Sequence, residues 1–148
     1  MKDTNRLSSK VALITGGGSG LGKATALHIA KEGAAAALLD IRLSLVERVA
    51  EEINASAGRA LAIACDVADE EQVSNAVRQT VDHFGEVTSL LANADTAGRV
   101  WIHETTLEDW QFLLDVNLAS PFLCSKPLSF FAIGGNYKPM HSRMSSNH

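Results

Sequence analysis

The sequence predicts an α/β protein, with a doubly wound parallel sheet of about four strands in the order 3-2-1-4. Short apolar segments alternate with longer segments that have helical periodicity. None of the apolar segments shows the alternation of apolar and polar residues that is typical of a half-exposed strand, as expected for strands covered on both faces. Right-handed crossovers between consecutive strands then give the predicted order. In such a sheet, ligands bind beyond the carboxyl ends of the strands, where the order reverses between strands 1 and 4.

The first half of the chain predicts two strand–helix units. Residues 11–15 form the first apolar run, which ends at a cluster of glycines, and a helix-forming segment follows over 20–32. Residues 34–39 form the second run, which Asp40 closes. The apolar residues after it recur at helical spacing until Gly58, which ends the pattern.

The middle of the chain predicts a third unit and a fourth strand. Residues 60–65 form the third apolar run, which ends at Asp66. Asp69 stands where a helix N-cap belongs, and Gly85 ends the amphipathic pattern that follows. Residues 88–92 are the fourth strand.

A last helix is predicted over 107–123. Thr106 is its candidate N-cap, and acidic residues occupy its first turn, where the helix dipole favours them. Trp101 and Trp110 flank its beginning, and we interpret both as packing residues.

The amino-acid composition limits the classes to which the protein can belong. The 148 residues are 46% hydrophobic and 20% charged, which fits one folded domain with a core. The net charge of -4 argues against a nucleic-acid surface and favours a small-molecule ligand. Cys65 and Cys124 form no C-x-x-C pair, and no histidine stands at metal-ligand spacing, so we predict neither a disulfide framework nor a metal site. We expect a reducing, cytoplasmic setting, and no apolar run is long enough to span a membrane.

The end of the chain differs in composition from the rest. All 17 acidic residues precede position 126, whereas residues 126–148 carry three basic groups and no acidic one. We therefore place a boundary at Lys126, between a folded unit over 1–125 and a tail over 126–148 that we expect to be poorly ordered.

The glycine-rich segment TGGGSGLGKATA permits two interpretations. From Gly17 it reads G-x-x-x-x-G-K, but Ala24 stands where a P-loop needs the Ser or Thr that ligates magnesium. From Thr15 it reads T-G-x-x-x-G-x-G, a spacing associated with a dinucleotide pyrophosphate held at a helix N-terminus. Asp40 supports the second interpretation, because a carboxylate at the end of strand 2 can accept hydrogen bonds from ribose hydroxyls.

Several motifs together resemble the short-chain dehydrogenase/reductase family, whose members are NAD-dependent oxidoreductases with a Rossmann-like fold. The motifs are T15-G16-x-x-x-G20-x-G22, D40, C65-D66-V67, N93-A94 and D115-V116-N117. The resemblance covers roughly the first 85% of the chain, fades around Ser125, and corresponds to the N-terminal half of a typical member.

The resemblance implies roles for individual residues. It implies that the Asp66 side chain bonds to the adenine amino group and that Val67 packs near the adenine ring. It also implies that Asn93 helps to hold the cofactor end of strand 4. Asn117 matches a catalytic asparagine of the family. The expected cofactor-binding residues are Gly16, Ser19, Gly20, Leu21, Gly22, Asp40, Asp66, Val67, Asn93 and Ala94.

The chain also departs from the family pattern. Asp95 replaces a glycine expected close to the cofactor, and its charge should weaken binding of the phosphates. The family's catalytic Ser and Tyr-x-x-x-Lys are not found: Tyr137 is followed four residues later by His141, and Pro139 interrupts any helix between them. We therefore expect a truncated dehydrogenase that is catalytically incomplete as given.

The function predicted is that of the NAD(H)-binding portion of an oxidoreductase acting on an alcohol or ketone. NAD should be preferred over NADP because Asp40 would repel a 2′-phosphate, although Arg42 stands close enough to attract one. Three alternatives stay open: an intact oxidoreductase whose tail supplies a base, a P-loop protein, and a regulatory or pairing module. The last would form a homo- or hetero-oligomer through the last helix.

Overall fold

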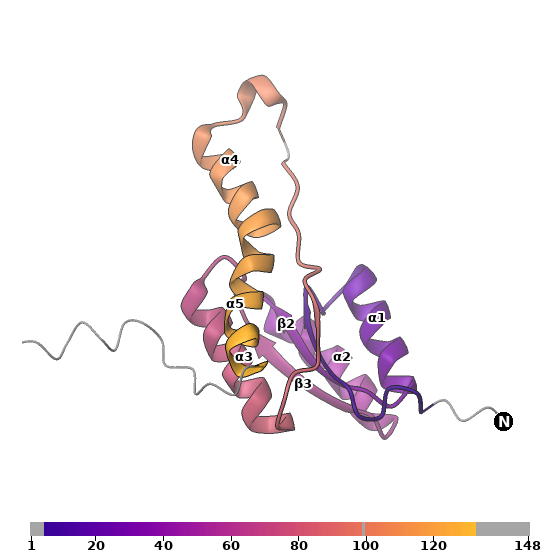
Figure 1. Ribbon diagram of the computed structural model, residues 1–148. Helices are drawn as coiled ribbons and strands as arrows, with labels where there is room; N and C mark the ends of the chain where they lie inside the picture. The colour runs from indigo at the N-terminus through magenta and orange to yellow at the C-terminus, as the bar shows by residue number, and fades with distance from the viewer. Residues whose placement is uncertain (1–4, 99, 133–148) are drawn as a thin grey trace, which may run out of the picture.

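The structure is a computed structural model that describes residues 5–98 and 100–132 (Figure 1). Strands and helices alternate over most of it, and helices alone make up its last part. The strands are β1 (Val11–Thr15), β2 (Ala35–Asp40), β3 (Arg59–Ala64) and β4 (Ser89–Leu91). The helices are α1 (Gly20–Lys31), α2 (Leu43–Ala55), α3 (Glu70–Phe84), the 3-10 helix η1 (Ile102–Glu104), α4 (Leu107–Leu114), the π-helix η2 (Asp115–Ala119) and α5 (Ser120–Ala132).

The strands form one parallel sheet in the order β3-β2-β1-β4, which confirms the predicted topology. β1 pairs with β2 from Val11 to Thr15, but it pairs with β4 at three positions only. The chain moves outward in one direction from β1 to β3 and returns to the other side of β1 with β4. The carboxyl ends of β1 and β4 therefore border the point where the strand order reverses.

Alternate residues of the strands enter two separate cores, one on each face of the sheet. Ile14 and Leu38 pack on one face with α1 and α2, whereas Leu13 and Leu39 pack on the other with α3 and α5. All four side chains are fully buried. This explains the uniformly apolar strands, because both faces of each central strand are covered by helices (Figure 1).

Local capping signals set the ends of α3 and the beginning of α4. The Asp69 side chain accepts a hydrogen bond from the Gln72 backbone N–H, and Gly85 ends the helix in a left-handed conformation, with φ of 90°. Thr106 and Asp109 form a reciprocal capping box at the start of α4. These caps are at the positions that the sequence predicts.

The helix predicted over 107–123 is longer than expected and runs on to Ala132 through η2 and α5. Pro127 lies inside α5, where proline removes a helical hydrogen bond. Its ring is fully buried, and the adjacent Leu128 packs against the core next to α3. Tertiary burial thus outweighs the local cost of proline, and the helix continues beyond the predicted end.

The helix crosses the boundary that the sequence places at Lys126. The Lys126 ammonium lies 2.6 Å from a carboxylate oxygen of Glu70 on α3, which joins the two helices at the surface. The first residues of the predicted tail, 126–132, therefore belong to α5. The rest of that tail, 133–148, lies outside the described residues.

The loop before α4 and α4 itself stand away from the sheet and its covering helices (Figure 1). No residue of α4 is buried. Trp101 and Trp110, which the sequence predicts to be packing residues, are 74% and 48% exposed, so that prediction is wrong for the described residues. The projecting position of α4 is the reason, since no described element covers it. None of the described helices is long and apolar enough to cross a membrane.

Candidate functional site

A cavity of about 630 Å³ lies at the carboxyl edge of the sheet. It is lined by the segments that follow all four strands and by one turn of the α4–η2 region. Gly22 and Asn117 are absent from its lining. The sequence-predicted residues that do line it are Gly16, Ser19, Gly20, Leu21, Asp40, Asp66, Val67, Asn93 and Ala94.

The three glycines of the motif each meet a different steric requirement. Gly16 turns the chain after β1 with φ of 64°, in the left-handed region that favours glycine. A Cβ at Gly22 would overlap the Gly16 carbonyl oxygen, so the beginning of α1 packs against the turn only because Gly22 lacks a side chain. Gly20, with φ of 53°, faces open space instead, with no heavy atom within 4 Å of a Cβ built there. Backbone amides at the start of α1 are thereby left accessible from the cavity.

The N-terminus of α1 is available to an anion. Its N-cap, Ser19, makes no side-chain capping bond, and its first turn holds no acidic residue. α3 and α4 have capping side chains and acidic first turns, whereas α2, like α1, has neither. The first amides of α1 and the positive end of its dipole therefore point toward the cavity, with no capping or acidic side chain from the helix's own first turn beside them.

Asp40 places a carboxylate at the end of β2. The residue is 8% exposed, and its Oδ1 accepts a hydrogen bond of 3.0 Å from the Arg42 backbone N–H. The Arg42 Nε lies 3.6 Å from the same oxygen, but the Arg42 side chain is 63% exposed. Asp40 is thus held by its own turn, and the Arg42 side chain that pairs with it is largely exposed at the cavity mouth.

The segment after β3 brings a second carboxylate to the same edge. The Asp66 Oδ1 accepts a hydrogen bond of 3.0 Å from the Ala68 backbone N–H, and Val67 beside it is 7% exposed. Burial raises the pKa of the preceding Cys65 to about 12, so this thiol is protonated at neutral pH. A protonated, buried thiol is a poor nucleophile, which leaves Cys65 a structural part of the wall.

Thr15 and Asn93 join the glycine turn to the end of β4. The Thr15 Oγ1 accepts hydrogen bonds of 3.0 Å from the backbone N–H groups of both Asn93 and Ala94. The Asn93 Nδ2 donates to the carbonyl oxygens of Thr15 and Gly16, at 3.2 and 3.3 Å. The side-chain N–H groups of Asn93 therefore hold the two walls of the cavity together.

Asn117 lies in η2 and fastens the loop that follows β4. Its Oδ1 accepts a hydrogen bond from the Thr96 backbone N–H, and its Nδ2 donates to the Thr96 carbonyl oxygen, both at 2.8 Å. The whole amide is thus engaged with one residue of the loop. The catalytic role expected for Asn117 stays a prediction, and this residue is not among those that line the cavity.

Besides Arg42, Cys65 and Asp95, four further lining residues are absent from the predicted set. Ile41 follows Asp40 and is 69% exposed, Phe112 and Val116 come from the α4–η2 region, and Thr96 is the residue held by Asn117. The spacing of 112 and 116 gives a helical face, but the sequence does not show that this face lies over the sheet edge. An apolar residue directly after the strand-end Asp40 is the one local signal that could have indicated Ile41.

The sequence model of the short chain dehydrogenase family matches residues 10–133. The chain belongs to that family. The match passes Ser125, where the resemblance was expected to fade, and ends one residue beyond α5. Membership favours the dinucleotide interpretation of the glycine-rich segment over the P-loop interpretation.

Curated relatives share more than a third of the aligned residues. The chain is 39% identical over 120 residues to cyclohexanol dehydrogenase from Acinetobacter sp., which covers 80% of this chain and 48% of that protein. It is 36% identical over 124 residues to 3-oxoacyl-[acyl-carrier-protein] reductase from Synechocystis sp., covering 83% of this chain and 50% of that protein. The chain thus spans about half the length of these relatives.

Solved structures agree with the fold at the same coverage. A dehydrogenase/reductase from Sinorhizobium meliloti superimposes with a TM-score of 0.81 at 35% identity, over 85% of this chain and 51% of that one. A short-chain dehydrogenase/reductase from Serratia marcescens, a double mutant, gives 0.79 at 36% identity, over 84% and 51%.

Proposed function

We propose that the cavity binds NAD(H), and that the chain is the cofactor-binding portion of an oxidoreductase acting on an alcohol or ketone. The observation that carries the proposal is the open space at Gly20 beside the uncapped N-terminus of α1. An anionic pyrophosphate fits there, because the helix amides and dipole lack another anion. When bound, the dinucleotide supplies the acceptor or donor of a hydride.

The remaining residues fit a dinucleotide that extends from this point along the sheet edge. The amides of α1 would bind the phosphates, and the Asp40 carboxylate would accept hydrogen bonds from ribose hydroxyls. Asp66 and Val67 would form one side of an adenine pocket, with the exposed Ile41 as an apolar contact. The cavity of about 630 Å³ lies within the range of ordinary ligand sites.

The binding site is tested by comparing two glycine substitutions. Gly20→Ala and Gly85→Ala both place a methyl group in open space on a backbone with positive φ, but Gly85 ends α3 away from the cavity. Both variants should lose stability, while Gly20→Ala alone should weaken NAD binding in calorimetry, by about tenfold or more. Equal NAD affinity in the two variants would contradict the proposal, as would magnesium-dependent ATP binding that Lys23→Ala abolishes.

Asp40 is the proposed selector of NAD over NADP. Its fixed carboxylate would repel a 2′-phosphate, while the exposed guanidinium of Arg42 could attract one. Asp40→Ala should therefore lower the ratio of NAD affinity to NADP affinity, and Arg42→Ala should raise it. Both ratios are measurable by calorimetry, and an unchanged ratio in Asp40→Ala would show that the carboxylate is not the selector.

We propose further that a polypeptide of these 148 residues alone does not turn over substrate. No Tyr-x-x-x-Lys occurs in the sequence, Tyr137 and His141 lie outside the described residues, and the Asn117 amide is occupied by Thr96. Without a positioned acid or base, a factor of roughly 10² to 10⁴ in rate is lost.

The turnover proposal is tested by following the NADH absorbance band with a panel of alcohols and carbonyl compounds. The panel includes cyclohexanol because one of the relatives is named cyclohexanol dehydrogenase. A chimera in which residues 126–148 are replaced by the C-terminal half of an active relative serves as the comparison. Turnover by the unmodified polypeptide that Tyr137→Phe abolishes would overturn the proposal.

A second candidate function is pairing with another chain through α4 and α5. Leu118 and Phe122, four residues apart, are 69% and 63% exposed, and Trp110 on α4 is 48% exposed. We propose a second copy of this chain as the partner, because the same apolar surface on two copies is self-complementary. Phe122→Glu should reduce the dimer fraction in sedimentation velocity, whereas Gln79→Glu on α3 should not. A monomer at all concentrations would contradict self-pairing and leave a longer relative as the partner to examine.

A further inference from the structure

The cavity carries an excess of negative charge before any ligand enters. Its charged lining side chains are Asp40, Asp66, Asp95 and Arg42, a formal sum of -2. Asp40 is paired with Arg42, and Asp66 accepts a backbone hydrogen bond from Ala68. Within residues 5–98 and 100–132, no group donates a hydrogen bond or ion pair to the Asp95 carboxylate. The charge of Asp95 is therefore exerted on solvent or on a ligand.

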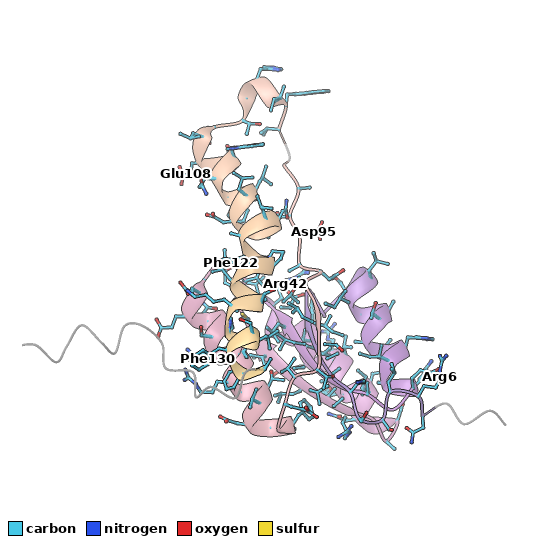
Figure 2. All side chains as sticks on the ribbon, viewed as in Figure 1. Arg6, Arg42, Asp95, Glu108, Phe122 and Phe130 are labelled. Carbon is cyan, nitrogen blue, oxygen red and sulfur yellow. The ribbon has the colours of Figure 1, made fainter. Side chains whose placement is uncertain are left out.

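Asp95 is held in place although it lies in a loop. The residue before it, Ala94, donates its backbone N–H to Thr15 Oγ1 at 3.0 Å. The residue after it, Thr96, is fastened at both its N–H and its carbonyl by the Asn117 amide. The backbone is thus anchored on each side of Asp95. Figure 2 shows the side chain on this loop, pointing away from α4.

The order of the strands fixes which part of the cavity Asp95 occupies. Asp40 and Asp66 follow β2 and β3, on one side of the glycine turn after β1, whereas Asp95 follows β4, on the other side. If the adenosine half lies toward β2 and β3, as proposed above, the phosphates lie at the turn. The other half of the dinucleotide then extends toward the β4 side, where Asp95 contributes a negative charge.

We propose that Asp95 makes the cavity discriminate between the redox states of the dinucleotide in favour of the oxidised form. The inference rests on the proposed NAD(H) function. Both forms carry two anionic phosphates, but only the oxidised form carries a positive charge on its nicotinamide ring. Asp95 repels the phosphates of both forms and attracts the ring of one. A site that binds the oxidised form more tightly lowers the reduction potential of the bound couple, which favours reduction of a carbonyl substrate.

The test is a comparison of NAD⁺ and NADH dissociation constants by calorimetry for the unmodified chain, Asp95→Asn and Asp82→Asn. Asp82 is the control, an exposed carboxylate near the end of α3, on the edge of the sheet opposite the cavity. Asp95→Asn should strengthen the binding of NADH relative to that of NAD⁺, so that the ratio of Kd for NADH to Kd for NAD⁺ falls about threefold, the size of an exposed charge interaction.

Salt dependence provides a second readout, since the Debye length shortens from about 30 Å at 0.01 M to 3 Å at 1 M. The threefold change should therefore shrink at high salt. An unchanged ratio in Asp95→Asn, or an equal fall in Asp82→Asn, overturns the inference while leaving the proposed function standing. Failure of both forms to bind any of the folded proteins overturns the proposed function and the inference together.

Discussion

At the scale of single residues, Thr15 has a larger part than its place in a glycine motif indicates. The side chain is 1% exposed, and its hydroxyl oxygen is the acceptor for two backbone N–H groups of the loop after β4. Buried N–H groups that lose their acceptor cost the full penalty of desolvation. Thr15 therefore links the glycine turn before α1 to the loop that follows β4, the strand beside β1 on the side opposite β2.

Replacement of Thr15 by valine should destabilise the protein more than the same replacement at Thr80. Thr15→Val leaves two partly buried donors without an acceptor, which costs about 1 to 3 kcal/mol. The Thr80 hydroxyl, also fully buried, donates to the Ala76 carbonyl within α3, and that carbonyl keeps its helical hydrogen bond in Thr80→Val. Its cost should stay below about 1 kcal/mol. Urea unfolding of both variants measures the difference, and equal losses would contradict this role of Thr15.

At the scale of elements, two buried thiols lie in the core between the sheet and its last helix. Cys65 follows β3 and Cys124 lies on α5, and both belong to the core that α3 and α5 cover. Burial raises the pKa of Cys65 to about 12 and that of Cys124 to about 11. Neither thiol ionises near neutral pH in the folded state, so both behave as small apolar groups within this core.

Stability should fall as the pH rises above about 9. The folded-state pKa values are raised, so the unfolded chain loses its thiol protons first and binds fewer protons than the folded chain between about pH 9 and 11 to 12. The stability contributed by the protonated thiols is complete below pH 9 and is lost across this window. Urea midpoints between pH 8 and 10.5 should decline less steeply in Cys124→Ala than in the unmodified chain. The same slope in both would show that Cys124 titrates alike in the two states.

Elements with local end signals are those that the sequence predicts well. Asp69 and Gly85 bound α3 through contacts within a few residues, and they are readable without knowledge of the fold. The end of the last helix is not readable in this way, because Pro127 is a stop signal that burial overrides. Local preference predicts an element boundary only where tertiary packing does not compete with it.

The same distinction applies to the candidate site. The glycines and Asp40 are readable because a parallel sheet brings strand ends to one edge. Phe112, Val116 and Thr96 reach the cavity through the position of the α4–η2 region above that edge, which depends on long-range packing. The bidentate contact between Asn117 and Thr96 likewise joins residues that no local pattern relates.

At the scale of the whole molecule, an acidic body carries an apolar projection. The net charge is -4 and the isoelectric point about 5.7, while the projecting α4 and the segment before it expose large apolar side chains. These are Val100, Trp101, Ile102, Leu107, Trp110 and Phe112. β4 adds an edge without a second strand neighbour among the described residues. Charge repulsion therefore opposes an association that apolar surface and strand edge favour.

Association should strengthen as the pH falls from 8 toward 5.7. Loss of net charge removes the repulsion between copies but leaves the apolar contacts unchanged. Light scattering at a fixed protein concentration should give a larger mean mass at the lower pH, and Phe122→Glu should reduce the rise. A mass that is independent of pH, or a rise that Phe122→Glu does not alter, would show that another surface holds the copies together.

The π-helix η2 (Asp115–Ala119) also fixes the phase between the two helices that it joins. A π turn holds about one residue more than an α turn, so it corresponds to a single-residue insertion in a continuous helix. A switch of this turn to α geometry at unchanged chain length would rotate α4 by about 100° around the axis of α5, whereas deleting one residue at the same time, such as Leu118, would keep the two helices in phase. Without that deletion, each side chain of α4 would face the direction that its neighbour in sequence faces now. The geometry of this one turn thus decides which side of α4 lies over the cavity and which side is left to solvent.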